Sequence, residues 1–473
     1  MRTRSSNPFL VCMTVMIAVA VGGCATAAGT TSPTQTAGTT LASPEPTTQP
    51  LSSPDVPAPG ALPGILLVGR SGSPDLELVV ANTGESVMKV PAGATDATWK
   101  RLVTATADTS GTIVRDLLAD GSFVGPVLEI KGRWRLPTIG TDRVPAGVSS
   151  DGSTIALVSA DDAAAGATSD ATSRFVIVRH FDGNRPTRAR DAELRLATVI
   201  ELRGHFEFDA LSPDGNILYV VEHLDGQTGS YQVRAVDVAT GKLRDGAIAD
   251  KRNIGEAMAG WPVGQVRRTD GVVLTVYRGP EHPFIHALNT IDAWAVCIDL
   301  PATGASDTAA AADWGLAADP AGRSVYAINA TLGIAAEINA TDLVVERTAS
   351  LQTASIGGPT SGGSAGAPSI VLAKFGHDEV GAAGRVVVSP DGETVWAAGA
   401  NGVVAIATRD LSVSRRMLGG TAVDRIAVAP DGSTVFALLH AGGRIVALDA
   451  ATGRNLGDVP GSGFDRLLAA APW

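Results

Sequence analysis

Several polar and aromatic side chains between residues 222 and 440 could contact a ligand. Carboxylates and imidazoles exchange protons and coordinate metal ions, amides and guanidinium groups hydrogen-bond polar groups, and an indole ring offers a flat apolar surface. The candidates are Glu222, His223, Trp261, Arg278, Glu281, His282, Asn329 and His440. Most of them directly follow short apolar runs, so we interpret them as residues at or just beyond strand ends. Such positions either surround a binding site or are polar because strand ends are exposed to solvent.

A metal site at His282, His286 and Cys297 is suggested by their closeness in sequence but not by their pattern. In a strand over residues 284–288, His286 shares a face with the apolar residues, whereas His282 precedes the strand. We therefore interpret His286 as a buried, hydrogen-bonded side chain and Cys297 as a buried apolar residue. The sequence contains no phosphate-binding loop and no dinucleotide fingerprint, and we expect neither a metal nor another cofactor.

The elements that would position these residues are short strands joined by a recurrent turn, from residue 64 onward. The turn occurs as Ser150-Asp151-Gly152-Ser153, Ser212-Pro213-Asp214-Gly215, Asp319-Pro320-Ala321-Gly322, Ser389-Pro390-Asp391-Gly392 and Ala429-Pro430-Asp431-Gly432. Proline fixes φ, aspartate accepts backbone N–H bonds, and glycine adopts the positive φ that closes a tight turn. We therefore assign these aspartates a conformational role rather than a metal-binding one.

The spacing of the repeats predicts an all-β fold, a β-propeller of four-stranded antiparallel blades. The last two turns lie 40 residues apart, which fits one blade. We place the first strands of seven blades near residues 96, 144, 206, 262, 313, 384 and 423. Residues 464–472 resemble a further innermost strand, and residues 65–92 resemble its three missing partners. Pairing of these ends closes the ring and gives eight blades; seven is the alternative if residues 96–131 form none.

Long irregular segments are expected mainly on one side of this ring. The connections between second and third strands, and between one blade and the next, share that side, because strand direction alternates within a blade. They include residues 160–173, 224–230, 250–262, 302–312 and 352–383, whereas residues 182–192 fall on the other side. The candidate residues at the ends of second strands would then surround the mouth of the central channel. Trp261, between two blades, is either an aromatic platform for a ligand or a packing residue.

The composition excludes several classes of protein. Hydrophobic residues make up 45% of the chain and charged residues 18%, which excludes a wholly disordered protein. A net charge of −11 argues against nucleic acid as a partner. Three cysteines cannot form a disulfide framework, so the fold must be stabilised by burial. We expect a monomer.

The first 63 residues predict an export signal followed by a tether. Arg2 and Arg4 precede an uncharged run from Phe9 to Val21, which is too short to be a membrane-spanning helix. The order Val21-Gly22-Gly23-Cys24 resembles the lipobox of bacterial lipoproteins; an ordinary signal peptide is the alternative. The resemblance implies a signal peptide over residues 1–23 and lipidation of Cys24. Residues 24–63, rich in Thr, Ser, Pro and Ala, read as a disordered tether to the propeller at 64–473.

The Asp-Gly hairpins, the Asp-x-x-Thr-Gly turns at 237–241 and 449–453, and the lipobox together resemble the bacterial YVTN/TolB-like β-propeller lipoproteins. Residues 258–301 are similar to uncharacterised secreted actinobacterial propellers. The resemblance implies a protein held at the extracytoplasmic face of the cell membrane by its lipid, and it supplies no mechanism.

The architecture serves binding proteins and enzymes alike, so several functions stay open. We favour a non-catalytic binding module whose loop-rich side contacts a cell-envelope protein, a glycan or a small ligand. The alternative is a lactonase or lyase at the central channel, with a metal ion held by residues such as Glu222, His223, Asn329 and His440. A quinoprotein dehydrogenase is a third possibility, but the tryptophan which that family places after the Asp-x-x-Thr-Gly turn is absent here.

Overall fold

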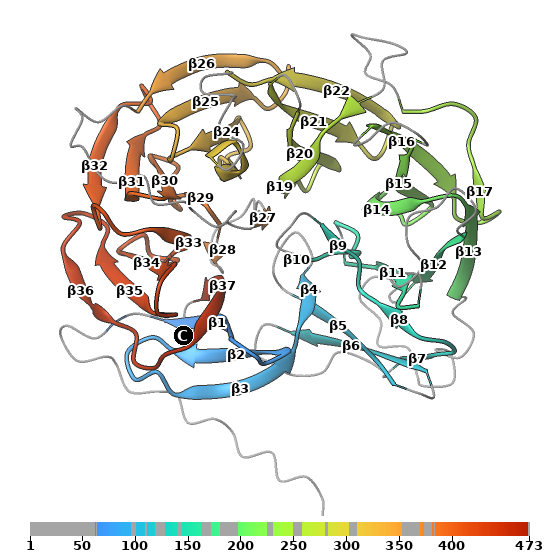
Figure 1. The fold of residues 1–473 in the computed structure, drawn as a ribbon, viewed down its shortest axis with the longest axis horizontal. Coiled ribbons are helices and arrows are strands. Elements are labelled where there is room, and N and C mark those ends of the chain that lie inside the picture. Colours follow the sequence, from blue (N-terminus) through green and yellow to red (C-terminus); the bar gives the residue numbers. More distant parts are fainter. Residues whose placement is uncertain are drawn as a thin grey trace, which may run out of the picture. The chain divides into compact units, whose positions relative to one another are not determined.

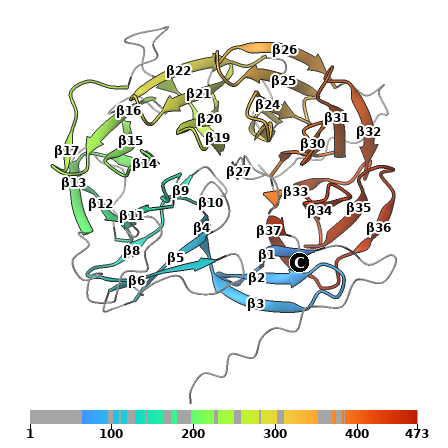
Figure 2. The ribbon, with the colours of Figure 1, turned by 180° about the vertical axis from the view of Figure 1, so that it is seen from behind.

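The fold is an eight-bladed β-propeller of four-stranded antiparallel blades (Figure 1; Figure 2 shows it from behind). The structure is a computed structural model that describes Leu62 and residues 64–471, with gaps at 96–100, 109–110, 119–127, 140–143, 151, 162–171, 180–196, 225–229, 249–257, 280–281, 302–309, 352–368, 373–380 and 383. Within the described ranges no helix is both long and apolar enough to cross a membrane.

In each of the first four blades, the strands follow one another from the innermost position outward. Blade 1 contains β37 (Phe464–Ala471), β1 (Ile65–Arg70), β2 (Asp75–Val80) and β3 (Ser86–Pro91). Blade 2 contains β4 (Gly93–Thr95), β5 (Arg101–Ala107), β6 (Thr112–Leu118) and β7 (Leu128–Ile130). Blade 3 contains β8 (Trp134–Arg135), β11 (Thr154–Ser159), β12 (Thr172–Arg179) and β13 (Ala197–Arg203). Blade 4 contains β14 (Phe206–Leu211), β15 (Ile217–His223), β16 (Ser230–Asp237) and β17 (Lys242–Leu243).

The second half of the ring follows the same order. Blade 5 contains β19 (Trp261–Arg267), β20 (Val272–Arg278), β21 (Pro283–Asn289) and β22 (Trp294–Asp299). Blade 6 contains β23 (Trp314–Ala318), β24 (Ser324–Asn329), β25 (Ile334–Asn339) and β26 (Val345–Ser350), and the 3-10 helix η2 (Ala310–Asp313) precedes it. Blade 7 contains β29 (Val386–Val388), β30 (Thr394–Gly399), β31 (Gly402–Ala407) and β32 (Val413–Met417). Blade 8 contains β33 (Val423–Val428), β34 (Thr434–Leu439), β35 (Ile445–Asp449) and β36 (Asn455–Asp458).

The ring closes through its two ends, as predicted. Strand β37 pairs antiparallel with β1, and Leu66 lies opposite Ala470 while Val68 lies opposite Leu467. Leu66, Val68 and Leu467 are all fully buried in a core shared with blade 8. Removing open edges in this way satisfies the backbone groups of both β1 and β37.

The prediction of eight blades is confirmed, with two differences in detail. Blade 2 forms within residues 93–130, so its first strand begins a few residues earlier than expected. In blade 3 the innermost position is divided between β8 and Val148, which bridges Ile155. The segment expected to begin that blade near residue 144 instead forms β10 (Val144–Pro145), which pairs with β9 (Thr138–Ile139). Pro145 cannot donate a backbone hydrogen bond, which suits this short pair better than a full inner strand.

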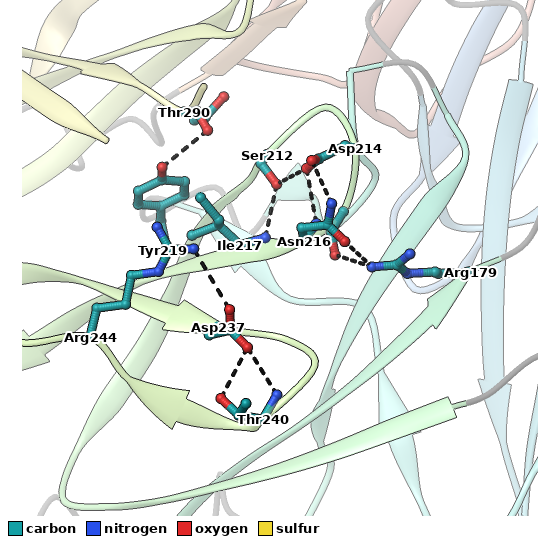
Figure 3. Close-up of polar contacts among 11 residues, drawn as sticks. Arg179, Ser212, Asp214, Asn216, Ile217, Tyr219, Asp237, Thr240, Arg244 and Thr290 are labelled. Atoms are coloured by element: carbon teal, nitrogen blue, oxygen red, sulfur yellow. Dashed lines mark hydrogen bonds and ion pairs between the residues drawn. The ribbon is translucent and has the colours of Figure 1, made fainter. Parts of the chain in front are cut away.

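The hydrophobic cores lie between neighbouring blades. One core joins blades 3 and 4, another joins blades 4 and 5, and a third joins blades 5 and 6. In β15, Leu218 packs toward blade 3 and Tyr219 packs toward blade 5. The Tyr219 hydroxyl also donates to the carbonyl oxygen of Thr290 in blade 5 at 3.0 Å (Figure 3). Strands apolar on both faces are therefore required by the ring.

The turn between β14 and β15 has the predicted conformational role (Figure 3). Ser212 Oγ donates to Asp214 Oδ1 at 2.6 Å and accepts from the backbone N–H of Ile217 at 2.9 Å. Asp214 Oδ1 also accepts from the backbone N–H of Asn216 at 3.0 Å, and Gly215 has a φ of 66°. The carboxylate is thus committed to the turn.

The strand bounds place the ends of the long connections on one side of the ring. Two of these connections lie within blades and join β11 to β12 and β15 to β16. Three lie between blades and follow blades 4, 5 and 6. The connection from β12 to β13 begins and ends on the other side. The connection from blade 6 to blade 7 was expected to be a loop. It contributes instead β27 (Ser369–Leu372), parallel to β19, and β28 (Gly381–Ala382), antiparallel to β37. Figure 1 shows β27 inside the ring.

Candidate metal centre

The start of β14 and the end of β15 bring His205, Glu207 and His223 together on one face of blade 4. His205 and Glu207 are two residues apart, so their side chains point to the same face of the strand. The backbone N–H of His223 donates to the carbonyl oxygen of His205 at 3.0 Å, which places these two residues opposite each other. The register of the hairpin, with Glu207 opposite Val221, completes the arrangement.

The ligand atoms of these three side chains lie within 4.8 Å of one another. His205 Nε2 is 3.7 Å from Glu207 Oε1, and His223 Nε2 is 3.4 Å from Glu207 Oε2. Two atoms that each lie about 2.0–2.1 Å from a tetrahedral ion are roughly 3.4 Å apart. The distances from the two Nε2 atoms to the Glu207 oxygens are therefore close to the ligand–ligand distances of a zinc centre.

The nitrogen of His223 that faces Glu207 has unused bonding capacity. His223 Nε2 is buried and makes no well-directed hydrogen bond with any group in the described part of the chain. It contacts Glu207 Oε2 at 3.4 Å, which is longer than a good hydrogen bond, and an ion bound between the two atoms would satisfy both of them. Both imidazole side chains are 34% exposed and the Glu207 side chain is 59% exposed, so an ion can reach them from solvent.

The pKa shifts of two of these side chains, His205 and Glu207, favour the forms that coordinate metals. Burial, and then repulsion from His223, lower the pKa of the His205 imidazole, which keeps that ring neutral. Contact with His223 is the leading cause that lowers the pKa of the Glu207 carboxyl. A neutral imidazole and an ionised carboxylate are the ligand forms of these side chains. Two nitrogens and one oxygen suit zinc and similar divalent ions, and three ligands leave one coordination position open.

A second pair of ionisable groups, Asp209 and Arg267, is contributed by the innermost strands of blades 4 and 5. Asp209 follows Glu207 on β14, where the pairing with β15 is irregular, and it is almost completely buried. Burial raises the pKa of Asp209 to about 7, and the opposing effect of Arg267 on β19 is smaller. Burial likewise lowers the pKa of Arg267 to about 10. Asp209 is therefore an acid that changes charge near neutral pH.

Of these three residues, only His223 was predicted from the sequence as a candidate; His205 and Glu207 were not. The available signal was the alternation His205-x-Glu207 on a strand paired with the strand that ends at His223. Glu222, the neighbouring candidate, points to the opposite face. Its Oε2 accepts from Gln232 Nε2 at 2.6 Å and Arg234 Nη1 at 2.7 Å, so it belongs to a local ion pair.

Three other candidates lie on the same side of the ring and make separate contacts. Asn329 is fully buried; its Nδ2 donates to the carbonyl oxygen of Ala310 at 2.7 Å, and its Oδ1 accepts from the N–H of Leu332 at 2.8 Å. His440 Nδ1 lies 2.9 Å from Asp424 Oδ1, and His282 Nε2 lies 2.8 Å from Asp299 Oδ1. These histidines each have one carboxylate partner, and they come from blades 8 and 5.

Trp261 and Arg278 are brought together at the start of blade 5. They face each other across β19 and β20, and the Arg278 guanidinium lies 5.3 Å from the centre of the Trp261 ring. Trp261 is 47% exposed, so part of its ring stays accessible despite this cation–π contact. The two remaining predicted residues, Glu281 and Cys24, lie outside the described residues.

Comparisons with known proteins support the fold. No family model matches the sequence, and no curated protein matches it. The structure of apo AztD from Citrobacter koseri is 12% identical, with a TM-score of 0.50, and the match covers 87% of this chain and 99% of that one. The dihydro-heme d1 dehydrogenase NirN (14% identity, TM-score 0.47) covers 88% of this chain and 76% of its own. The periplasmic gluconolactonase PpgL of Pseudomonas aeruginosa (18%, 0.38) covers 79% and 99%. At 12% identity the likeness to AztD concerns the fold alone.

Proposed function

We propose that this protein is a lipid-anchored extracytoplasmic β-propeller that binds a divalent transition-metal ion, with zinc as the best fit. The observation that carries the proposal is the cluster of His205, Glu207 and His223, whose ligand atoms lie within 4.8 Å of one another. Two imidazoles and a carboxylate form a donor set typical of zinc.

The proposed location rests on the first 63 residues. A charged start, a short apolar run and the lipobox ending at Cys24 support lipidation, and the Thr- and Pro-rich segment that follows would hold the propeller away from the headgroups. A protein in this position would bind its ion outside the cytoplasm. The same proposal includes a partner, which would be a protein, a glycan or a small molecule of the cell envelope. The loop-bearing side of the propeller would bind it.

A metal-assisted hydrolase or lyase at the same three ligands is the second candidate. It is favoured by the open coordination position, because a bound water there would become a nucleophile near neutral pH. The zinc-loaded protein should be incubated with a panel of lactones. Ring opening that depends on Glu207 would support the enzyme, whereas tight zinc binding without turnover supports the binding protein.

Zinc titration of the detergent-extracted full chain tests the binding role. The titration is carried out in competition with a zinc chelator, and we expect the wild-type chain to take one zinc ion from it. His205→Ala and Glu207→Gln should each lower the zinc affinity about 100-fold or more. His440→Ala is the matched control, because His440 lies on the same side of the ring and pairs with a single carboxylate. Equal zinc binding by all four proteins, or no binding by the wild type, would overturn the proposal.

A further inference from the structure

Cys297, Met258 and His286 meet at the seam between blades 4 and 5, in a cluster separate from the proposed zinc centre. Cys297 Sγ lies 3.8 Å from Met258 Sδ and 4.0 Å from His286 Nδ1. The whole chain has only three cysteines, six methionines and seven histidines. A thiol, a thioether and an imidazole at one point are therefore uncommon in this sequence.

The sheet register accounts for the meeting. His286 on β21 and Cys297 on β22 are direct partners across the antiparallel pair, so their side chains share a face. Met258 comes from β18 (Met258–Ala259), a short additional strand that pairs with β16 of blade 4 and sets Met258 opposite Tyr231. The three side chains thus converge from both sides of the seam.

The two distances measured at Cys297 match those expected around a single ion. Ligand atoms that lie about 2.0–2.3 Å from one metal, at angles between tetrahedral and trigonal, are separated by roughly 3.4–4.0 Å. Both the sulfur–sulfur distance of 3.8 Å and the sulfur–nitrogen distance of 4.0 Å fall at the upper end of that range. Cys297 Sγ therefore lies at a suitable distance from each of the other two ligand atoms to share an ion with it.

The surroundings would protect such an ion while leaving it accessible. His286 is buried, and its ring lies nearly perpendicular to that of Tyr277. Tyr277 stacks on Tyr231 at 5.1 Å and on Phe284 at 5.3 Å. Cys297, which the sequence predicted to be buried, is only partly buried, and both Cys297 and Met258 pack against the same aromatic cluster. Aromatic neighbours and partial exposure of the two sulfur ligands suit the retention and entry of a metal ion.

We propose that Cys297, Met258 and His286 form a binding site for monovalent copper. Thiolate and thioether sulfur are soft ligands that select Cu(I), and the harder donors of the His205 cluster prefer zinc. On binding, the Cys297 thiol loses its proton to solvent and the thiolate forms the copper–sulfur bond, with no change in oxidation state. Affinity should therefore rise with pH while the thiol is protonated.

Anaerobic titration with Cu(I), in the presence of a chromogenic Cu(I) chelator, tests the site. The full-length chain should carry Cys12→Ser and Cys24→Ser, which leaves Cys297 as the sole thiol. We expect one Cu(I) per chain, a loss of affinity of about 100-fold in Cys297→Ser and about tenfold in Met258→Leu. Met88→Leu, which changes another partly buried methionine, is the matched control.

Either of two titration results would overturn the site: no Cu(I) retained against the chelator, or the same affinity in Met258→Leu and Cys297→Ser as in the parent. X-ray absorption at the copper edge of the folded parent gives an independent answer should Cys297→Ser fail to fold. A first shell with sulfur and nitrogen supports the site, and a shell of oxygen and nitrogen alone contradicts it. Zinc binding measured on the same samples reports on the His205 cluster, so the two proposals can fail separately.

Discussion

The imidazole rings of His205 and His223 are stacked, with centroids 4.3 Å apart and planes inclined by 17°. Parallel rings in this register direct their Nε2 atoms to the same carboxylate, that of Glu207. Two charged rings in such a stack would repel each other, and the pKa of His205 is lowered by burial and by His223. The geometry therefore allows both Nε2 atoms and the Glu207 carboxylate to bind one metal ion.

The pH dependence of stability should reveal the buried acid Asp209. Burial raises its pKa to about 7, above its value in the unfolded chain, so the folded protein binds an additional proton below pH 7. This contribution to stability is present at low pH and is lost as pH rises toward and through 7. The side chain introduced by Asp209→Asn does not titrate, so this pH-dependent contribution is absent from the variant. Relative to the wild type, the free energy of unfolding of the variant should therefore rise by roughly 1–3 kcal/mol from pH 5 to pH 8.

Urea unfolding of both proteins at the two pH values measures this difference. Arg267→Lys is a useful comparison, because it keeps a positive charge near Asp209 and should preserve the sign of the dependence. A stability difference that stays constant from pH 5 to pH 8 would show that Asp209 titrates as an ordinary carboxyl.

Closure of the ring should be sensitive to Leu467 at the centre of β37. Leu467 is fully buried between β1 and blade 8, so Leu467→Ala removes contacts on which both ends of the chain depend. We expect a loss of about 2–4 kcal/mol in the free energy of unfolding. Leu468→Ala, one residue away on the less buried face, is the control and should cost clearly less. Similar losses in both variants would argue against a closing role for β37.

Membrane attachment should depend on the thiol of Cys24. If that thiol carries the lipid, the wild-type chain enters the detergent-rich phase on phase separation, and Cys24→Ser moves to the aqueous phase. Cys297→Ser, which changes the cysteine of the propeller, should partition as the wild type does. A Cys24→Ser protein that stays with the detergent would contradict lipidation at this position.

Much of the fold could be predicted because its signals are local or repeated. The turn at Ser212, Asp214 and Gly215 uses only neighbouring residues, so its conformation can be read from the sequence. The closing strand at 464–471 resembles the first strand of blade 8, and that repetition predicted its pairing with β1. The division of the inner strand of blade 3 had no such signal, since it arises from the competing pair β9 and β10.

The candidate centre was harder to predict because it depends on register and on which face of a strand is used. Glu222 and His223 are adjacent in sequence, yet they point to opposite faces, and only His223 joins His205 and Glu207. Cys297 and Met258 likewise meet only because β18 adds to the edge of β16. Pairing of this kind joins residues far apart in the sequence, and no pattern in composition indicates it.

Anomalous diffraction from crystals of the zinc-loaded protein tests the central claim most directly. Data collected on both sides of the zinc absorption edge identify the ion and locate it. We predict an anomalous difference peak within about 2.0–2.2 Å of nitrogen atoms of His205 and His223 and an oxygen of Glu207. A structure in which these three side chains bind no zinc, while zinc occupies other surface histidines such as His440, would contradict it.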